Sequence, residues 1–207
     1  MPDLADNGQI VIHDRLHLAS ASPRRRELLH ALGLVFTAAA EDVDESRRPG
    51  EDAGTMAVRL AVAKAHAAAA DGRSDKVILA ADTVVTLGDD VFGKPQSRDD
   101  ALNMLDVLSG TTHRVLTGVA VVHRGEVRSA VSESVVRFRE ISPDEASLYW
   151  QSGEPRDKAG AYAIQGKGGI FVAAISGSYS GIVGLPVFET AQLLGQAGIE
   201  VLGSTGN

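Results

Sequence analysis

The chain lacks cysteine altogether, and this absence removes several classes of chemistry. Without thiols there is no disulfide framework, no thiolate metal site and no cysteine nucleophile. Aromatic residues make up only 4% of the 207 residues, whereas alanine and glycine are abundant, which favours close packing of helices on a sheet. The 44% of hydrophobic residues can still form a substantial core, as one domain or two closely joined lobes.

Long apolar runs and an excess of basic residues are also missing. The strongest apolar runs, residues 77–81 and 169–175, are far shorter than the roughly 18 residues that a membrane span needs. Residues 1–14 carry three Asp and no apolar middle, so they do not resemble a secretory signal, and we expect a cytoplasmic protein. A net charge of -7 and a pI near 5.3 argue against binding to duplex nucleic acid. An anionic ligand therefore needs a local cluster of cations.

Helix and strand signals alternate along most of the chain. Strands are predicted over residues 16–20, 77–81 with a continuation over 83–87, 114–123, 127–139 and 169–175. Helices are predicted over residues 22–32, 55–70, 97–110, 142–152 and 186–196, several of them opened by serine with proline or an acidic residue close behind. No internal repeat or low-complexity linker is present. This order predicts an α/β fold with a mixed sheet.

A cluster of cations lies at the first predicted strand-to-helix junction, where residues 20–26 read SASPRRR. Positive side chains in the first turn of a helix are unfavourable, because that end already carries partial positive charge. Free backbone N–H groups, two hydroxyls and three guanidinium groups would together suit phosphate oxygens. The alternative is a solvated basic face with no ligand.

Asp82 follows the apolar run of residues 77–81. Ligands of α/β sheets gather at the carboxyl ends of strands, and a carboxylate there is either desolvated or bound to a cation. Asp82 is therefore a candidate functional group, although it could instead cap a turn or pair with a lysine. Lys64 lies on an alanine-rich helix, where a lysine would ordinarily face solvent. Glu45 lies in a polar loop and has no sequence signal of its own. Lys94 is followed by a proline, which restrains the backbone and could hold the ammonium group in one place.

Residues 153–166 read GEPRDKAGAYAIQG, a polar segment rich in glycine and alanine. Gln165 in this segment can offer a paired donor and acceptor to the edge of a base, although the segment could equally be a connecting loop. Three common motifs are excluded: the P-loop lacks its Ser or Thr, there is no G-x-S-x-G elbow, and the six histidines form no H-x-x-x-H pair.

Taken in order, these segments resemble the Maf family of nucleoside triphosphate pyrophosphatases, also described as septum formation inhibitors. The resemblance extends over about residues 16–196. Its segments are LASASPRR at 18–25, ADTVV at 81–85, GKP at 93–95, LSG at 108–110 with TH at 112–113, DKAGAY at 157–162 and VGLP at 183–186. It implies an elongated mixed sheet flanked by helices, with two lobes around a cleft, in a single domain over residues 16–207 that follows an irregular extension of residues 1–15.

The resemblance also implies an activity, which is hydrolysis of a nucleoside triphosphate between its α and β phosphates with the help of Mg²⁺ or Mn²⁺. Asp82 matches the proposed general base, Glu45 and Lys94 match other active-site positions, and Asp82 and Glu45 are the expected metal ligands. Ser20, Arg25 and Lys64 match phosphate-side positions. Arg24, Thr83 and Gln165 match positions associated with a preference for dTTP and UTP.

Clearance of noncanonical nucleotides, a role in cell division arrest and a homodimer are implied by the resemblance as well. The chain departs from the family pattern in about twelve extra residues before the first strand and in Ser180-Gly181, where an asparagine is common. The second departure leaves the details of the last loop of the cleft open.

Two other functions remain open at this point. A nonenzymatic regulator of septum formation would bind a nucleotide or a protein, but binding alone needs cations more than the carboxylates of Asp82 and Glu45. A nucleotidyltransferase also surrounds a triphosphate with Arg, Lys and metal. Release of pyrophosphate without a second substrate distinguishes the hydrolase from the transferase.

Overall fold

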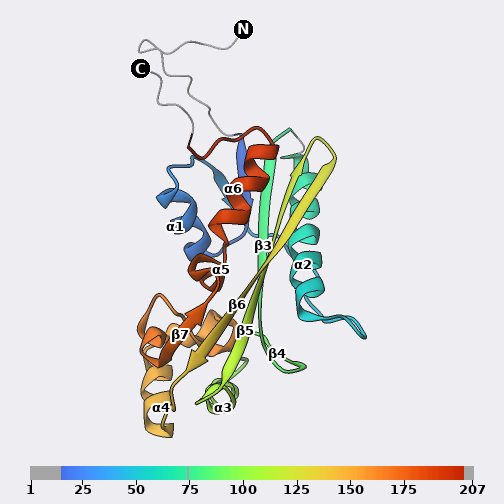
Figure 1. Cartoon of the computed structure of the whole chain (residues 1–207). Helices are drawn as coiled ribbons and strands as arrows, with labels where there is room; N and C mark the ends of the chain where they lie inside the picture. Colours follow the sequence, from blue (N-terminus) through green and yellow to red (C-terminus); the bar gives the residue numbers. More distant parts are fainter. Residues whose placement is uncertain (1–14, 74, 203–207) are drawn as a thin grey trace.

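The computed structural model describes residues 15–73 and 75–202. The predicted extension over residues 1–15 therefore lies outside the described residues, apart from Arg15. The described chain forms a mixed seven-stranded sheet flanked by six α-helices (Figure 1), which confirms the predicted α/β class. Among these residues, no helix is long and apolar enough to cross a membrane.

The seven strands of the sheet are β1 (Leu16–Ala19), β2 (Thr37–Ala39), β3 (Val77–Leu87), β4 (Asp90–Phe92), β5 (Thr112–His123), β6 (Glu126–Phe138) and β7 (Val172–Ser176). Three of them, β3, β5 and β6, are long, with 11, 12 and 13 residues, and run along the length of the molecule (Figure 1). The strand order in the sheet is β2-β1-β3-β5-β6-β7, and β4 pairs with β3. β1 is parallel to β2 and β3, while the other pairs are antiparallel. The short strands β2 and β4 were not predicted, because three residues carry too little periodicity.

The helices and turns follow most of the predicted start and stop signals. They are α1 (Pro23–Ala31), α2 (Ala53–Ala68), η1 (Ala69–Arg73), α3 (Arg98–Leu108), α4 (Pro143–Gln151), η2 (Glu154–Asp157), η3 (Ala159–Ala161), η4 (Lys167–Phe171), α5 (Tyr179–Val183) and α6 (Val187–Gln196). The capping box of Ser142 and Glu145 is present in both directions. The strand predicted over residues 169–175 begins only at Val172, because a 3₁₀ turn precedes it. Helix α5 lies in a segment that was expected to be a loop.

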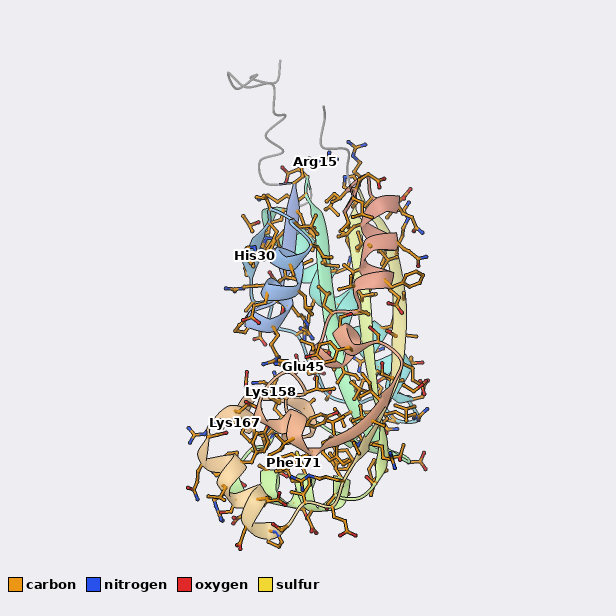
Figure 2. All side chains as sticks on the ribbon, turned by 60° about the vertical axis from the view of Figure 1, so that its left-hand side comes forward. Arg15, His30, Glu45, Lys158, Lys167 and Phe171 are labelled. Carbon is orange, nitrogen blue, oxygen red and sulfur yellow. The ribbon has the colours of Figure 1, made fainter. Side chains whose placement is uncertain are left out.

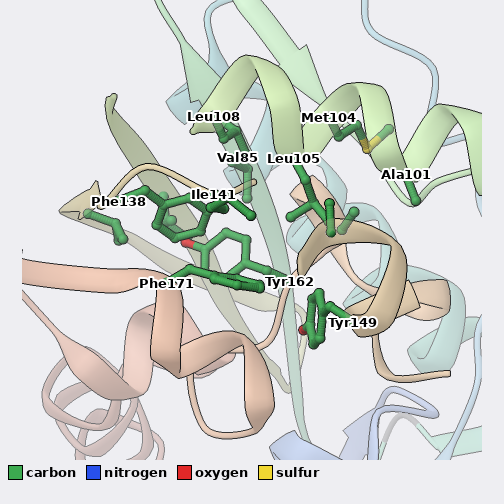
Figure 3. Packing of buried hydrophobic residues seen from close by; sticks show 14 of the residues in the cluster. Val85, Ala101, Met104, Leu105, Leu108, Phe138, Ile141, Tyr149, Tyr162 and Phe171 are labelled. Carbon is green, nitrogen blue, oxygen red and sulfur yellow. The ribbon is translucent and has the colours of Figure 1, made fainter. Parts of the chain in front are cut away.

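Alternation along β3 decides which helix each of its residues meets. Ile78 and Ala80 pack in the cluster that includes alanines of α2, whereas Val77, Leu79 and Ala81 pack with leucines of α1 and α6. Successive side chains of a strand point to opposite faces, so α2 covers one face of the sheet and α1 and α6 cover the other. A third cluster, under α3 and α4, is rich in aromatic rings (Figure 3).

Gly118 of β5 controls how closely α2 approaches the sheet. It pairs with Asp82 of β3, and a Cβ added at Gly118 would lie 2.3 Å from the carbonyl oxygen of Ala57 in α2. Backbone atoms of a packed helix cannot move aside as a flexible side chain can. Glycine is therefore required here by the close contact between helix and strand.

Replacing Gly118 by alanine is expected to lower the free energy of unfolding by about 1–3 kcal/mol, because the added methyl overpacks the contact with α2. Urea denaturation followed by circular dichroism measures the change. Gly93→Ala is the control, since a Cβ at Gly93 has open space around it. A Gly118→Ala protein as stable as the Gly93→Ala control would contradict the close contact.

Candidate functional site

A cavity of about 490 Å³ opens beside the end of β1. Residues from the start of α1, the loop before α2, β3, β4 and the turns after α4 line it. In Figure 2, Glu45 and Lys158 mark two of these segments. All nine residues assigned to the site from sequence line this one cavity: Ser20, Arg24, Arg25, Glu45, Lys64, Asp82, Thr83, Lys94 and Gln165.

Asp82 lies inside β3 and not after it, because β3 continues to Leu87. The expectation that Asp82 stands at the carboxyl end of its own strand is therefore wrong. The strand that ends here is β1, whose pairing with β3 extends only as far as Leu18 opposite Leu79. Asp82 thus lies just beyond the point where a parallel neighbour leaves the sheet, and such points leave room for ligands.

Lys64 of α2 connects the two carboxylates of the site. Its Nζ lies 2.5 Å from Glu45 Oε1 and 2.6 Å from Asp82 Oδ1. The side chains of Lys64 and Asp82 are each only 12% exposed, so the expectation that Lys64 faces solvent is wrong. Asp82 points to the face that α2 covers, and this brings the lysine within reach. The alternative in which Asp82 pairs with a lysine is therefore observed, inside the cavity.

The charges around Glu45 keep it ionised. Burial alone would raise the pKa of Glu45, but the hydrogen bond and charge of Lys64, with smaller effects of Lys94 and Arg25, hold that pKa below its ordinary value. Glu45 is therefore a carboxylate at neutral pH.

Arg25 belongs to α1, which covers the face of the sheet opposite α2, and its side chain contacts three separate segments. Its Nε donates to the carbonyl of Gly184 at 2.7 Å, Nη1 to the hydroxyl of Ser20 at 3.1 Å, and Nη2 to the hydroxyl of Thr83 at 3.3 Å. Thr83 also shares a hydrogen bond with Thr117, with 3.0 Å between the oxygens. Burial lowers the pKa of Arg25, although Asp82 and Glu45 oppose this. Arg25 therefore does not belong to a solvated basic face.

Arg24 reaches the opposite side of the cavity. Its Nη1 donates to Asp157 Oδ2 at 3.3 Å, and Asp157 also pairs with Lys158. Burial would raise the pKa of Asp157, but Lys158 and Arg24 hold it below its ordinary value. Asp157 and Lys158 belong to the DKAGAY segment, yet the sequence pattern assigned them no role in the site.

The supports of Arg25 could not be recognised from the sequence pattern. Thr117 has no motif around it, and it reaches Thr83 only because β5 pairs with β3. Gly184 adopts a φ of +126°, which favours glycine, and its presence in the VGLP segment is the one signal available. Ser180, where the family commonly has asparagine, accepts a hydrogen bond from Val187 N at 3.0 Å and so holds the start of α6.

Carboxylates and cations therefore meet on both sides of one cavity, which suits a phosphate chain. Among residues 15–73 and 75–202 there is no group of three His, Cys, Asp or Glu side chains that could hold a metal ion. The cavity offers the pair of Glu45 and Asp82. A metal cage made of protein side chains alone is thus not preformed in the described part of the chain.

Comparison with known proteins identifies the family of this chain. Residues 15–197 match the family model described as Maf-like protein. The chain belongs to the Maf family. It is 52% identical over 189 residues to a dTTP/UTP pyrophosphatase of Hahella chejuensis, covering 90% of this chain and 94% of the relative. It is 49% identical over 191 residues to a dTTP/UTP pyrophosphatase of Chromobacterium violaceum, covering 90% and 96%. The Maf resemblance predicted from the ordered segments is confirmed.

Proposed function

We propose that this chain hydrolyses dTTP and UTP to the nucleoside monophosphate and pyrophosphate. The observation that carries the proposal is the placement of Asp82 and Glu45 beside Lys64 and Arg25 in one cleft. The names of relatives about half identical to this chain support the same substrates. The carboxylates favour hydrolysis over simple binding, which needs cations alone.

In the proposed reaction, Asp82 accepts a proton from the water that attacks the α phosphorus in line. The bond from the water oxygen to phosphorus forms as the bond from phosphorus to the bridging oxygen breaks, and pyrophosphate leaves. Lys64, Arg25 and Lys94 stabilise the negative charge that develops on the phosphate oxygens, which is the main source of catalysis in phosphoryl transfer.

The residues present fit a divalent metal ion. Mg²⁺ is commonly held by one or two carboxylates together with substrate phosphates and water. Glu45 and Asp82 provide two such oxygens, and both lie within 2.6 Å of the same Lys64 nitrogen, so both can face a single cation. A metal ion held by Glu45 and Asp82 would neutralise phosphate charge in the cleft.

Gln165 is the proposed reader of the base. Its side chain is exposed and lines the cavity, and a carboxamide can pair with both an acceptor and the neighbouring N–H of uracil or thymine. A base that lacks an acceptor next to an N–H group cannot form both hydrogen bonds with the Gln165 carboxamide. UTP and dTTP are therefore expected to be better substrates than 7-methyl-GTP.

Replacing Gln165 by alanine is expected to lower kcat/KM for UTP and dTTP roughly ten- to a hundredfold, because a paired hydrogen bond is lost. Pyrophosphate release from UTP, dTTP and 7-methyl-GTP measures this in the presence of Mg²⁺. Gln192→Ala, at an exposed position of α6, is the matched control. A wild-type preference for 7-methyl-GTP, or an unchanged Gln165→Ala variant, would contradict the assignment.

The same assay distinguishes the rival functions. UTP supplied alone should yield UMP and pyrophosphate in equal amounts. A nucleotidyltransferase would release pyrophosphate only with a second substrate, and a nonenzymatic regulator would bind UTP without releasing any.

A further inference from the structure

The turn that carries Gln165 is attached to a carboxylate behind the cleft. The backbone N–H groups of Lys167 and Gly168 donate to the two oxygens of Glu154, each at 3.0 Å. Glu154 does not line the cavity, whereas Gln165 does. Glu154 therefore contacts the turn from the side that faces away from the cavity.

A second attachment comes from α4. The hydroxyl of Tyr149 accepts a hydrogen bond from Ala163 N at 3.0 Å and donates to Glu154 Oε1 at 2.7 Å. Tyr149 is buried against Phe171, with ring centroids 5.2 Å apart (Figure 3). Residues 163 and 167–168, on both sides of Gln165, are thus tied to one Tyr149–Glu154 pair.

Two glycines allow this close contact. A Cβ at Gly166 would lie 2.3 Å from Glu154 Oε2, and a Cβ at Gly168 would lie 2.5 Å from the hydroxyl oxygen of Tyr149. The turn around Gln165 is closed by a hydrogen bond from Gly166 N to the carbonyl oxygen of Ala163, at 3.2 Å. Gly166 and Gly168 of the AIQGKGG segment are therefore explained by the Tyr149–Glu154 pair, and not by a phosphate-binding loop.

The protonation states fix the direction of these bonds. Burial would raise the pKa of Glu154, but the hydrogen bonds from Tyr149, Gly168 and Lys167 hold that pKa below its ordinary value. Burial and the neighbouring carboxylate raise the pKa of Tyr149. At neutral pH the carboxylate therefore only accepts, and the tyrosine supplies the hydrogen between them.

We propose that Glu154, with Tyr149, is a positioning residue for base selection, which holds the turn so that the Gln165 carboxamide stands in the cleft. The inference rests on the proposed function, because it assigns to Glu154 a part in the choice between nucleotides. Glu154 does not line the cavity, so a nucleotide bound there would have neither its phosphates nor its reacting atoms against Glu154. Its loss should therefore change which base is accepted while leaving the hold on the phosphate chain intact.

Glu154→Gln is the first test, because the amide places N–H groups where the turn needs an acceptor. The ratio of kcat/KM for UTP to that for ATP is expected to fall roughly tenfold. The Kd for inorganic tripolyphosphate, measured by calorimetry, should change less than twofold. Glu145→Gln is the matched control, since Glu145 is also bonded to backbone and to Arg139 but lies away from the cavity.

Tyr149→Phe is the second variant, and it should shift the same ratio in the same direction because Ala163 N loses its acceptor. Amide hydrogen exchange at Lys167 and Gly168 should be faster in Glu154→Gln than in wild type or in Glu145→Gln. An unchanged UTP-to-ATP ratio in both Glu154→Gln and Tyr149→Phe overturns the proposal, and so does an equal loss for nucleotides and tripolyphosphate. A wild type that does not hydrolyse UTP or dTTP would instead refute the proposed function.

Discussion

Asp82→Asn is expected to lower kcat by roughly 10²–10⁴-fold while the protein still folds. Asparagine has nearly the same shape, and its carbonyl oxygen can keep the bond to Lys64, but it cannot take a proton from water. Lys64 also keeps its ion pair with Glu45, so no unpaired charge is left buried. Pyrophosphate release from UTP measures the loss of kcat, and a thermal melt followed by circular dichroism shows whether the variant folds.

The control for this variant is Asp106→Asn, at an exposed position of α3 outside the cavity, which should leave kcat unchanged. Near-normal turnover by Asp82→Asn with Mg²⁺ or Mn²⁺ would refute Asp82 as the base. An unfolded Asp82→Asn protein would show that Asp82 has a structural role and not a catalytic one.

Arg25→Ala is expected to lower kcat/KM for UTP roughly 10²–10³-fold, the range seen when one donor to a developing negative charge is removed. Two of its three partners are hydroxyls, those of Ser20 and Thr83. A hydroxyl can rotate and donate its hydrogen to a phosphate oxygen. The hydroxyls of Ser20 and Thr83 can therefore give up their bonds to Arg25 and bond to the phosphate instead, which frees the guanidinium to bind it as well. The bond to the Gly184 carbonyl keeps the side chain in place meanwhile.

Binding measurements can show whether Arg25 acts on the phosphate chain of the nucleotide. Arg25→Ala should weaken a nonhydrolysable UTP analogue more than it weakens UMP in a calorimetric titration. Arg25→Lys keeps the charge but lacks the planar fork, and it should recover only part of the affinity. Arg98→Ala, at a half-exposed position, serves as the control. Equal losses for the analogue and UMP would contradict a phosphate-side role.

The local features of the fold could be predicted from sequence because their signals are local. The hairpin of β5 and β6 and the capping box of Ser142 and Glu145 depend on neighbouring residues, and both are observed. The partners of Lys64 could not be predicted, since they depend on how α2 lies on β3. That arrangement is set by the contact at Gly118, a residue far from Lys64 in the chain.

The same distinction applies to the candidate site. All nine residues assigned from the sequence line one cavity, and six of them (Ser20, Arg24, Arg25, Asp82, Thr83 and Lys94) lie in short segments that the family resemblance could match. Thr117 and Glu154 were not predicted, since their roles arise from pairings with residues elsewhere in the fold. The apolar run of residues 77–81 stops before Asp82 and so predicts a strand end there, but periodicity does not show which neighbouring strand ends beside it.

The bond between Arg25 and Gly184 joins residues 159 positions apart, and this separation sets the order of events during translation. At typical rates of synthesis, roughly 10–30 s pass between the emergence of the two residues. Until Gly184 leaves the ribosome, the Arg25 guanidinium has no carbonyl to anchor it, and the phosphate side of the cleft is unfinished. A nascent chain therefore completes the proposed triphosphate site only after Gly184 has emerged.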